Sequence, residues 1–90
     1  MDQDKLNQLR AKLDEVHQWP AVYMFKFILP NDHQKILHLK GLFNESVEFR
    51  EQLSRNGNYV SITVKELVLN ADTVFERYTH ASKIEGIISL

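Results

Sequence analysis

The dipeptide Asn56-Gly57 lies between two stretches in which apolar and polar residues alternate, 47–54 and 59–69. Asn-Gly in this position is the strongest short-range signal for a β-hairpin, because both residues tolerate the backbone of a tight turn. A two-residue turn at this dipeptide sets the pairing of the two strands. The apolar pairs that then face each other, on one side of the hairpin, are Leu53 with Val60 and Phe49 with Val64.

One acidic residue interrupts the first strand of this hairpin. In the same register Glu51 faces Ile62, which places a carboxylate among apolar side chains. Inward-pointing charges are typical of edge strands, because they prevent pairing with further chains. We therefore expect the stretch 47–54 to lie at an edge of its sheet.

The rest of the chain changes between strand-like and helical periodicity. The stretch 21–29 is aromatic-rich, alternating and apolar on both faces, so a central strand is expected there. Asn31 with Gln34 is typical of a capping box at a helix start, and Asn70 is an N-cap candidate for the last helix. The predicted elements are a helix at 4–17 with the apolar stripe Leu6, Leu9, Leu13 and Val16, a strand at 21–29, a helix at 31–43, the hairpin, a helix at 70–82 and a strand at 84–90.

This order, a helix followed by β-α-β-β-α-β, is that of two split βαβ units. It predicts an α+β, ferredoxin-like sandwich, in which two helices lie on one face of a four-stranded antiparallel sheet. An extra N-terminal helix precedes this unit. We expect one domain over residues 1–90, with 1–18 as the helical extension and 19–90 as the ferredoxin-like core.

Charge and cysteine content exclude several classes of protein. The 90 residues carry a formal charge of −1 and no cysteine. There is thus no bulk attraction to nucleic acid or anionic lipid, and disulfides, thiol catalysis and Cys-ligated metals are excluded. The polar N-terminus does not resemble a signal peptide, and the longest apolar run, Ala21–Phe25, is too short to span a membrane. We expect a cytoplasmic protein without membrane contact.

Three activities that occur on ferredoxin-like frames require specific residues. Metal transfer requires the missing cysteines. Acyl-phosphate hydrolysis requires a Gly- and Arg-containing anion loop after the first strand, where this chain has the short acidic loop 30–32. Binding of single-stranded RNA requires exposed aromatic side chains on the central strands, and Tyr59 is the one aromatic residue expected there. We therefore expect no nucleic-acid partner.

Catalytic and metal-binding patterns are also missing from the sequence. The four histidines have no partner at ligand spacing, and Glu45, Glu48 and Glu51 cannot share one face of a strand. We expect no catalytic residues, no metal site and no cofactor, and hence a protein that is not an enzyme.

The remaining candidate for function is a surface. One face of the sheet is expected to expose several apolar side chains, and contiguous apolar patches usually mark interfaces. The N-terminal helix has an apolar stripe of its own, so either this helix covers the sheet or both surfaces bind a protein partner or a second copy. The last strand also leaves an edge open for addition of a partner strand. The candidate interaction face consists of Val22, Met24, Ile28, Tyr59, Leu67 and Leu69.

The segments Tyr23–Pro30, Ser54–Thr63 and Ala71–Phe75, together with Ile84–Leu90, resemble the YbeD-like family of conserved bacterial proteins of unknown function. The resemblance covers roughly residues 19–90 and implies a ferredoxin-like fold close to ACT regulatory domains. ACT domains bind small metabolites, often in a Gly-containing loop after the first strand. A regulatory, metabolite-binding domain is therefore the alternative function. Its candidate ligand loop consists of Asn31, Asp32 and His33, which contains no glycine.

Overall fold

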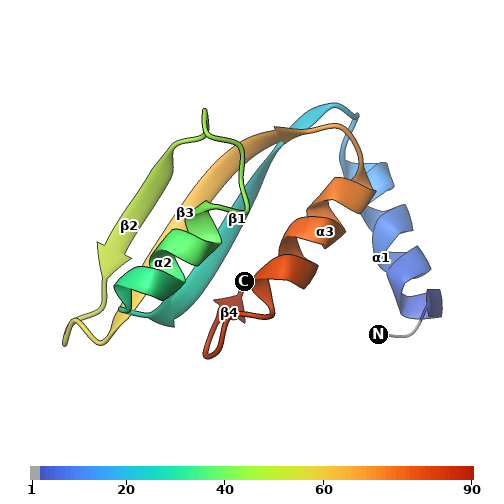
Figure 1. Ribbon diagram of the computed structural model, residues 1–90. Helices are drawn as coiled ribbons and strands as arrows, with labels where there is room; N and C mark the ends of the chain where they lie inside the picture. The colour runs from blue at the N-terminus through green and yellow to red at the C-terminus, as the bar shows by residue number, and fades with distance from the viewer. Residues whose placement is uncertain (1–2) are drawn as a thin grey trace.

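Figure 1 shows the computed structural model, which describes residues 3–90 except for the side chain of residue 6. Within these residues the strands form one antiparallel sheet in the order β2-β3-β1-β4, which is the ferredoxin-like order. The predicted α+β class and the predicted order of elements are confirmed. The elements are α1 (Gln3–Val16), β1 (Ala21–Pro30), α2 (His33–Lys40), β2 (Phe49–Leu53), β3 (Tyr59–Val68), α3 (Ala71–Ala81) and β4 (Ile88–Ser89).

The two long strands β1 and β3 carry the core. They pair along their whole lengths, from Ala21 opposite Val68 to Pro30 opposite Tyr59, so the expected central position of β1 is confirmed. Because side-chain direction alternates along a strand, one set of residues faces α2 and α3. The largest fully buried side chains are Phe25, Phe27 and Leu29 of β1, Ile62, Val64 and Val68 of β3, Leu39 of α2 and Val74 of α3.

The hairpin has the predicted register and a longer loop than predicted. Both predicted apolar pairs face each other, and β2 is an edge strand. However, residues 55–58 connect the bonded pair Ser54 and Tyr59, whose N···O distance is 2.9 Å. A two-residue type I′ turn needs positive φ at both central residues, and positive φ occurs here at Gly57 (73°) but not at Asn56. The longer loop is centred on the same dipeptide, which leaves the register unchanged.

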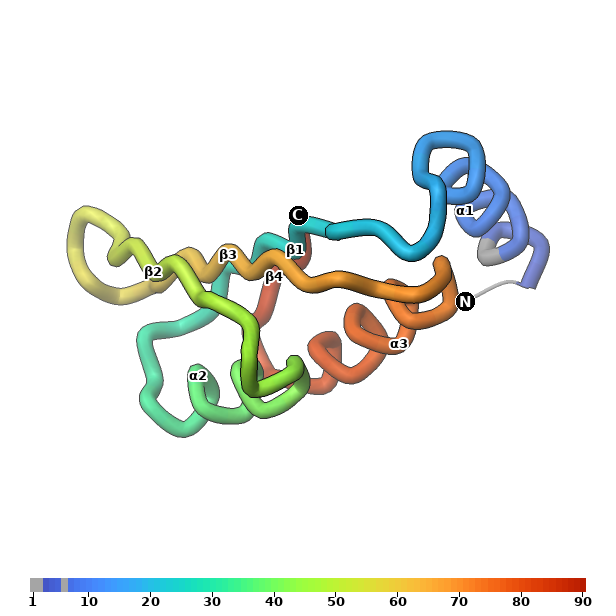
Figure 2. Tube along the Cα trace, turned by 90° about the horizontal axis from the view of Figure 1, so that it is seen from above, coloured from blue at the N-terminus to red at the C-terminus, as the bar shows by residue number. Residues whose placement is uncertain are grey.

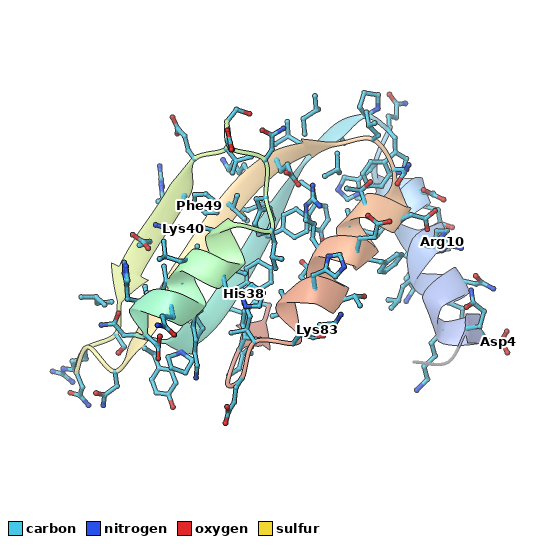
Figure 3. The ribbon with its side chains drawn as sticks, viewed as in Figure 1. Asp4, Arg10, His38, Lys40, Phe49 and Lys83 are labelled. Atoms are coloured by element: carbon cyan, nitrogen blue, oxygen red, sulfur yellow. The ribbon has the colours of Figure 1, made fainter. Side chains whose placement is uncertain are left out.

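The β2 carboxylate that was predicted to lie among apolar side chains forms an ion pair. Glu51 lies on the side of the sheet that faces α2, and its Oε1 is 3.0 Å from Nζ of Lys40. The same ammonium group is 5.5 Å from the centre of the Phe49 ring, and Figure 3 shows these two side chains next to each other. The edge strand is thus joined to α2 by an ion pair and a cation–π contact.

The start of α2 differs from the prediction by one residue. The N-cap is Asp32 rather than Asn31, because its Oδ1 accepts hydrogen bonds from the N–H groups of Gln34 (2.9 Å) and Lys35 (3.2 Å). Asn31 instead donates from Nδ2 to the carbonyl of Gly57 at 3.0 Å and so joins this loop to the hairpin loop. Both residue types are good caps, so residue type alone does not distinguish between them.

Substitution at these two positions tests the assignment of the cap. We expect Asp32→Ala to lower the free energy of unfolding by about 1 kcal/mol, because two N–H groups of the first turn lose their acceptor. Asn31→Ala removes one exposed hydrogen bond and is expected to lower it less. Urea unfolding followed by circular dichroism measures both changes. An equal or larger loss for Asn31→Ala would contradict the assignment.

The C-terminal strand is shorter than the predicted 84–90. Only Ile88–Ser89 pairs as a strand, opposite Ile28 and Phe27 of β1. The N–H of Leu90 then donates to the carbonyl of Lys26 at 2.9 Å. Along the described chain, β4 therefore accompanies β1 no further than Lys26.

The residues before β4 form a turn instead of a strand. Ile84 is buried in the core directly after α3, and Gly86 has a φ of 83°, a left-handed conformation. A Cβ added to Gly86 would lie 2.9 Å from Cγ of Pro30, so glycine is required by both the backbone conformation and the space. This turn brings the chain back against the end of β1.

The helices are distributed unequally over the sheet. Figure 2 shows α2 and α3 on one face, as predicted, and we call the opposite face of the sheet the open face.

α1 lies beside α3 at the end of the sheet where β1 begins, and its Arg10 forms an ion pair with Asp72 (Nη2–Oδ1 2.6 Å). Because the apolar side chains of the open face remain exposed, the alternative in which the N-terminal helix covers them is wrong. Leu6 of its predicted stripe has a side chain outside the described part.

Candidate functional site

The most exposed apolar side chains of the predicted interaction face gather at one end of the sheet. Val22 of β1 lies directly opposite Leu67 of β3, and Met24 is the next residue of β1 on the open face. Leu69 follows directly after β3. These four side chains are 56–70% exposed. We call Val22, Met24, Leu67 and Leu69 the apolar end of the open face.

The other two residues of the predicted face lie apart from this end. Tyr59 is paired with Pro30 at the opposite end of the long strands and is half-exposed. Ile28 is half-buried and lies opposite Ile88 of β4. The predicted set is therefore divided into two groups along the sheet.

Three cations occupy the middle of the open face. Lys26 and Arg50 lie opposite Thr63 from the two strands that flank β3, and Lys65 lies opposite Met24. Within the described residues, none of the three takes part in an ion pair. Two shallow cavities of about 310 and 220 Å³ lie around Arg50 and Thr63. We call Lys26, Arg50 and Lys65 the basic row.

A larger cavity of about 950 Å³ lies between α1 and α3. We call it the groove. It is lined mainly by apolar side chains and by Lys12, and none of the described lining residues is acidic. Sequence reasoning missed it, because an amphipathic stripe does not reveal how closely its helix packs on the next. Its apolar lining consists of Leu9, Leu13, Val16, Val74, Phe75 and Leu90, together with the ring of Tyr78.

Two phenol groups of the groove lining lie next to each other. The hydroxyl oxygens of Tyr23 and Tyr78 are 3.3 Å apart. Burial, followed by this hydrogen bond, raises the pKa of Tyr78 far above its usual range. His17 is half-buried, lines the groove and stacks on Trp19 with 5.1 Å between ring centroids. The groove thus offers an apolar, partly aromatic surface.

The predicted ligand loop lies on the surface next to the hairpin loop. The Asp32 carboxylate caps α2 and the Asn31 amide bonds to the carbonyl of Gly57, so both polar groups already have partners. His33 is exposed at the first position of α2. None of these three residues lines a cavity described above. Binding of a metabolite by this loop stays a prediction.

One buried charge was not singled out by sequence reasoning. Glu66 of β3 is 4% exposed and faces the helices. Its Oε1 accepts from Nε of Arg77 at 2.8 Å, while its Oε2 accepts from Nη2 of Arg77 at 3.2 Å and from the N–H of Asn44 at 3.0 Å. The signal was present in the alternation of β3, where Glu66 is a charged residue among otherwise apolar helix-facing positions. Three donors satisfy this carboxylate, so it connects β3 to α3 and to the loop after α2.

The described residues contain neither a cluster of metal ligands nor a membrane-spanning helix. Among them, no three His, Asp or Glu side chains gather as metal ligands would. Of the helices in residues 3–90, none combines the length and the apolar character needed to cross a bilayer.

Comparisons with known proteins address the family of this chain. No curated protein and no solved structure gave a match. The YbeD-like resemblance therefore stays a prediction, since no named relative tests it. A family model does match, over residues 14–90, which include the whole ferredoxin-like unit and the last turn of α1. The chain belongs to the family described as "Protein of unknown function (DUF493)".

Proposed function

We propose that this protein is a non-enzymatic interaction domain that binds a protein partner through the open face of its sheet. The observation that carries the proposal is the apolar end. Val22, Met24 and Leu67 are in register on neighbouring central strands and remain exposed although α1 is long enough to cover them. Contiguous apolar side chains on a rigid sheet are the usual core of an interface.

The charges beside the apolar end favour an acidic partner. The basic row forms no ion pair inside the described chain, although Glu48 lines a cavity together with Arg50 and Lys65. Carboxylates of a bound protein can therefore pair with the row. Such pairing speeds association and selects orientation. RNA also carries negative charge, but bases need exposed aromatic rings on which to stack. Tyr59 lies at the far end of β3, and Phe49 is half-buried on the helix side of β2. A protein surface that combines apolar and acidic residues fits the face better.

The buried polar groups support a role without catalysis. Glu66, the one buried charged side chain of the core in the described residues, is bonded to three donors and is held away from the cavities. A general acid or base needs access to a substrate proton. Glu66 therefore acts as a structural group in this proposal.

Charge substitutions at the apolar end test the proposed function. We expect the double variant Met24→Asp/Leu67→Asp to reduce complex formation by about tenfold or more, because an interface would bury two unpaired carboxylates. The tagged wild-type protein is used to isolate partners from a native lysate. Quantitative mass spectrometry then compares each partner between wild type and variant.

The matched control carries a charge at an equally exposed leucine elsewhere. Leu37 of α2 is 54% exposed and lies on the helix side of the sheet, so Leu37→Asp is expected to retain every specific partner. Circular dichroism shows that all variants stay folded. Partners retained by the double variant, or lost equally with Leu37→Asp, would contradict binding through the open face.

A further inference from the structure

One stretch of β1 has main-chain groups without a neighbouring strand. Asn31 and Asn58 bond across the β1–β3 pair (N···O 2.9 Å), and alternate residues of an antiparallel pair bond to the same neighbour. The odd-numbered residues of β1 therefore bond to β3, and the even-numbered ones point toward β4. Lys26 conforms to this pattern, because its carbonyl accepts from Leu90.

The same alternation directs the N–H and C=O groups of Val22 and Met24 away from β3. β4 pairs with β1 only at Phe27 and Ile28, with Leu90 reaching Lys26. Within residues 3–90, no main-chain hydrogen bond is made by Val22 or Met24 on this side. β1 is thus a central strand at one end and an unpaired edge at the other.

This unpaired edge borders the groove. Leu90, beside Lys26, and Tyr23, between the two unpaired residues, both line the groove. The groove therefore extends along the line that β4 would follow if it continued beside β1. Main-chain donors and acceptors thus lie next to an apolar cavity between α1 and α3.

We propose that an extended segment of the protein partner adds to the sheet as a strand beside Val22 and Met24. This inference rests on the proposed function and specifies the conformation and charge of the partner. The residue of the segment opposite Tyr23 faces the groove, because side chains alternate across a strand. An apolar side chain fits there. The flanking residues lie on the open face, where an acidic side chain opposite Met24 is within diagonal reach of Lys26.

Charge and shape favour a partner segment over a second copy of this chain. Pairing of two β1 edges would bring Lys26 and Lys65 of both copies together on one face, where like charges repel each other. The groove is also bounded by α1 and α3, so it admits a single strand more readily than a strand with its own helices. Among the described residues that line the groove, Lys12 is cationic and none is acidic, so no acidic side chain there repels an acidic segment.

The probe is a set of synthetic eight-residue peptides in which Val or Leu alternates with Glu. The control set has the same composition, with the apolar residues in one block and the glutamates in another. Amide exchange of the ¹⁵N-labelled 90-residue protein is measured by NMR with and without peptide. We expect the alternating peptides to slow exchange at Val22 and Met24 about tenfold, because both N–H groups become hydrogen-bonded. The control set is expected to leave both rates unchanged.

Two variants of Met24 separate the main chain from the side chain. Met24→Pro removes the outward N–H without removing a bond to β3, a position that proline tolerates in sheets. It is expected to weaken binding of the alternating peptides about tenfold. Met24→Ala keeps the N–H and is expected to bind them within about threefold of wild type. The exchange measurement on wild type tests the inference even where Met24→Pro does not fold.

The remaining outcomes distinguish strand addition from its alternatives. If amide exchange at Val22 and Met24 is already slow without peptide, and becomes slower as the protein concentration rises, the edge is occupied by a second copy. Peptide-induced shifts confined to Tyr78 and Leu13 would show that the groove takes a side chain alone, and no binding would also overturn the inference. If Leu67→Asp abolishes binding of the alternating peptides and Met24→Pro does not, the proposed open-face function is retained and the added strand is excluded. The reverse result would exclude the open face and retain the strand.

Discussion

Replacement of Arg77 by methionine is expected to lower the free energy of unfolding by about 3 kcal/mol. Glu66 would then be a buried carboxylate whose remaining donor is the N–H of Asn44. Removal of one partner from a buried ion pair typically costs about 3–5 kcal/mol, and the lower value applies because the Arg77 side chain is 23% exposed. Methionine keeps an apolar stem beside Phe43, over which the guanidinium lies at 5.7 Å. Urea unfolding followed by circular dichroism measures the loss.

A double variant shows whether the unpaired charge is the cause. In Glu66→Gln/Arg77→Met the amide carbonyl can still accept from the N–H of Asn44, and no charge is buried. We expect roughly half or more of the loss to be recovered, because paired substitution of a buried ion pair is often nearly neutral. A double variant no more stable than Arg77→Met alone would show that the unpaired charge of Glu66 is not the cause of the loss.

The ion pair illustrates a limit of local periodicity. The alternation of β3 correctly predicts which side of the strand faces the helices, and Glu66 lies on that side. Its partners come from α3 and from the loop after α2. Their approach depends on how both elements pack on the sheet, so the sequence pattern could indicate an anomaly at Glu66 but not the group that compensates its charge.

Elements defined by local signals were predicted well. The Asn56-Gly57 dipeptide centres the hairpin, and therefore the register of β2 on β3 is the predicted one even though the loop is longer. The N-cap at Asn70 is also confirmed, because its Oδ1 accepts from the N–H of Thr73 at 2.9 Å. The strand at 84–90 was predicted too long, because alternation alone does not show that Gly86 adopts a positive φ.

The candidate surfaces also differ in whether local sequence patterns predict them. The apolar end of the open face follows from strand alternation and register, so Val22, Met24 and Leu67 were placed correctly on it. The groove depends on the packing of α1 beside α3, and the free edge depends on the length of β4. Neither is a property of one periodic segment, which is why sequence analysis did not locate them.

The largest loss of stability is expected at the aromatic cluster on which the groove rests. The fully buried ring of Phe25 lies 4.7 Å from the ring of Tyr23 and 5.3 Å from that of Tyr78 between centroids. Phe25→Ala is expected to lower the free energy of unfolding by about 4 kcal/mol, because it leaves a cavity between α3 and the sheet. This is a large share of the total stability of about 5–13 kcal/mol expected for a domain of this length. Urea unfolding followed by circular dichroism measures it.

Two further variants show whether the cavity left by Phe25→Ala causes the loss of stability. Phe25→Leu fills most of the volume and is expected to lose clearly less stability than Phe25→Ala. Phe49→Ala, at a half-buried ring of the edge strand, is also expected to lose less stability. A larger loss there would show that the core depends more on Phe49 than on Phe25.

Because Phe25 contacts the two tyrosines that line the groove, Phe25→Ala should also weaken binding of the alternating peptides under conditions where it remains folded. Undiminished binding would show that Tyr23 and Tyr78 keep their positions without the ring of Phe25.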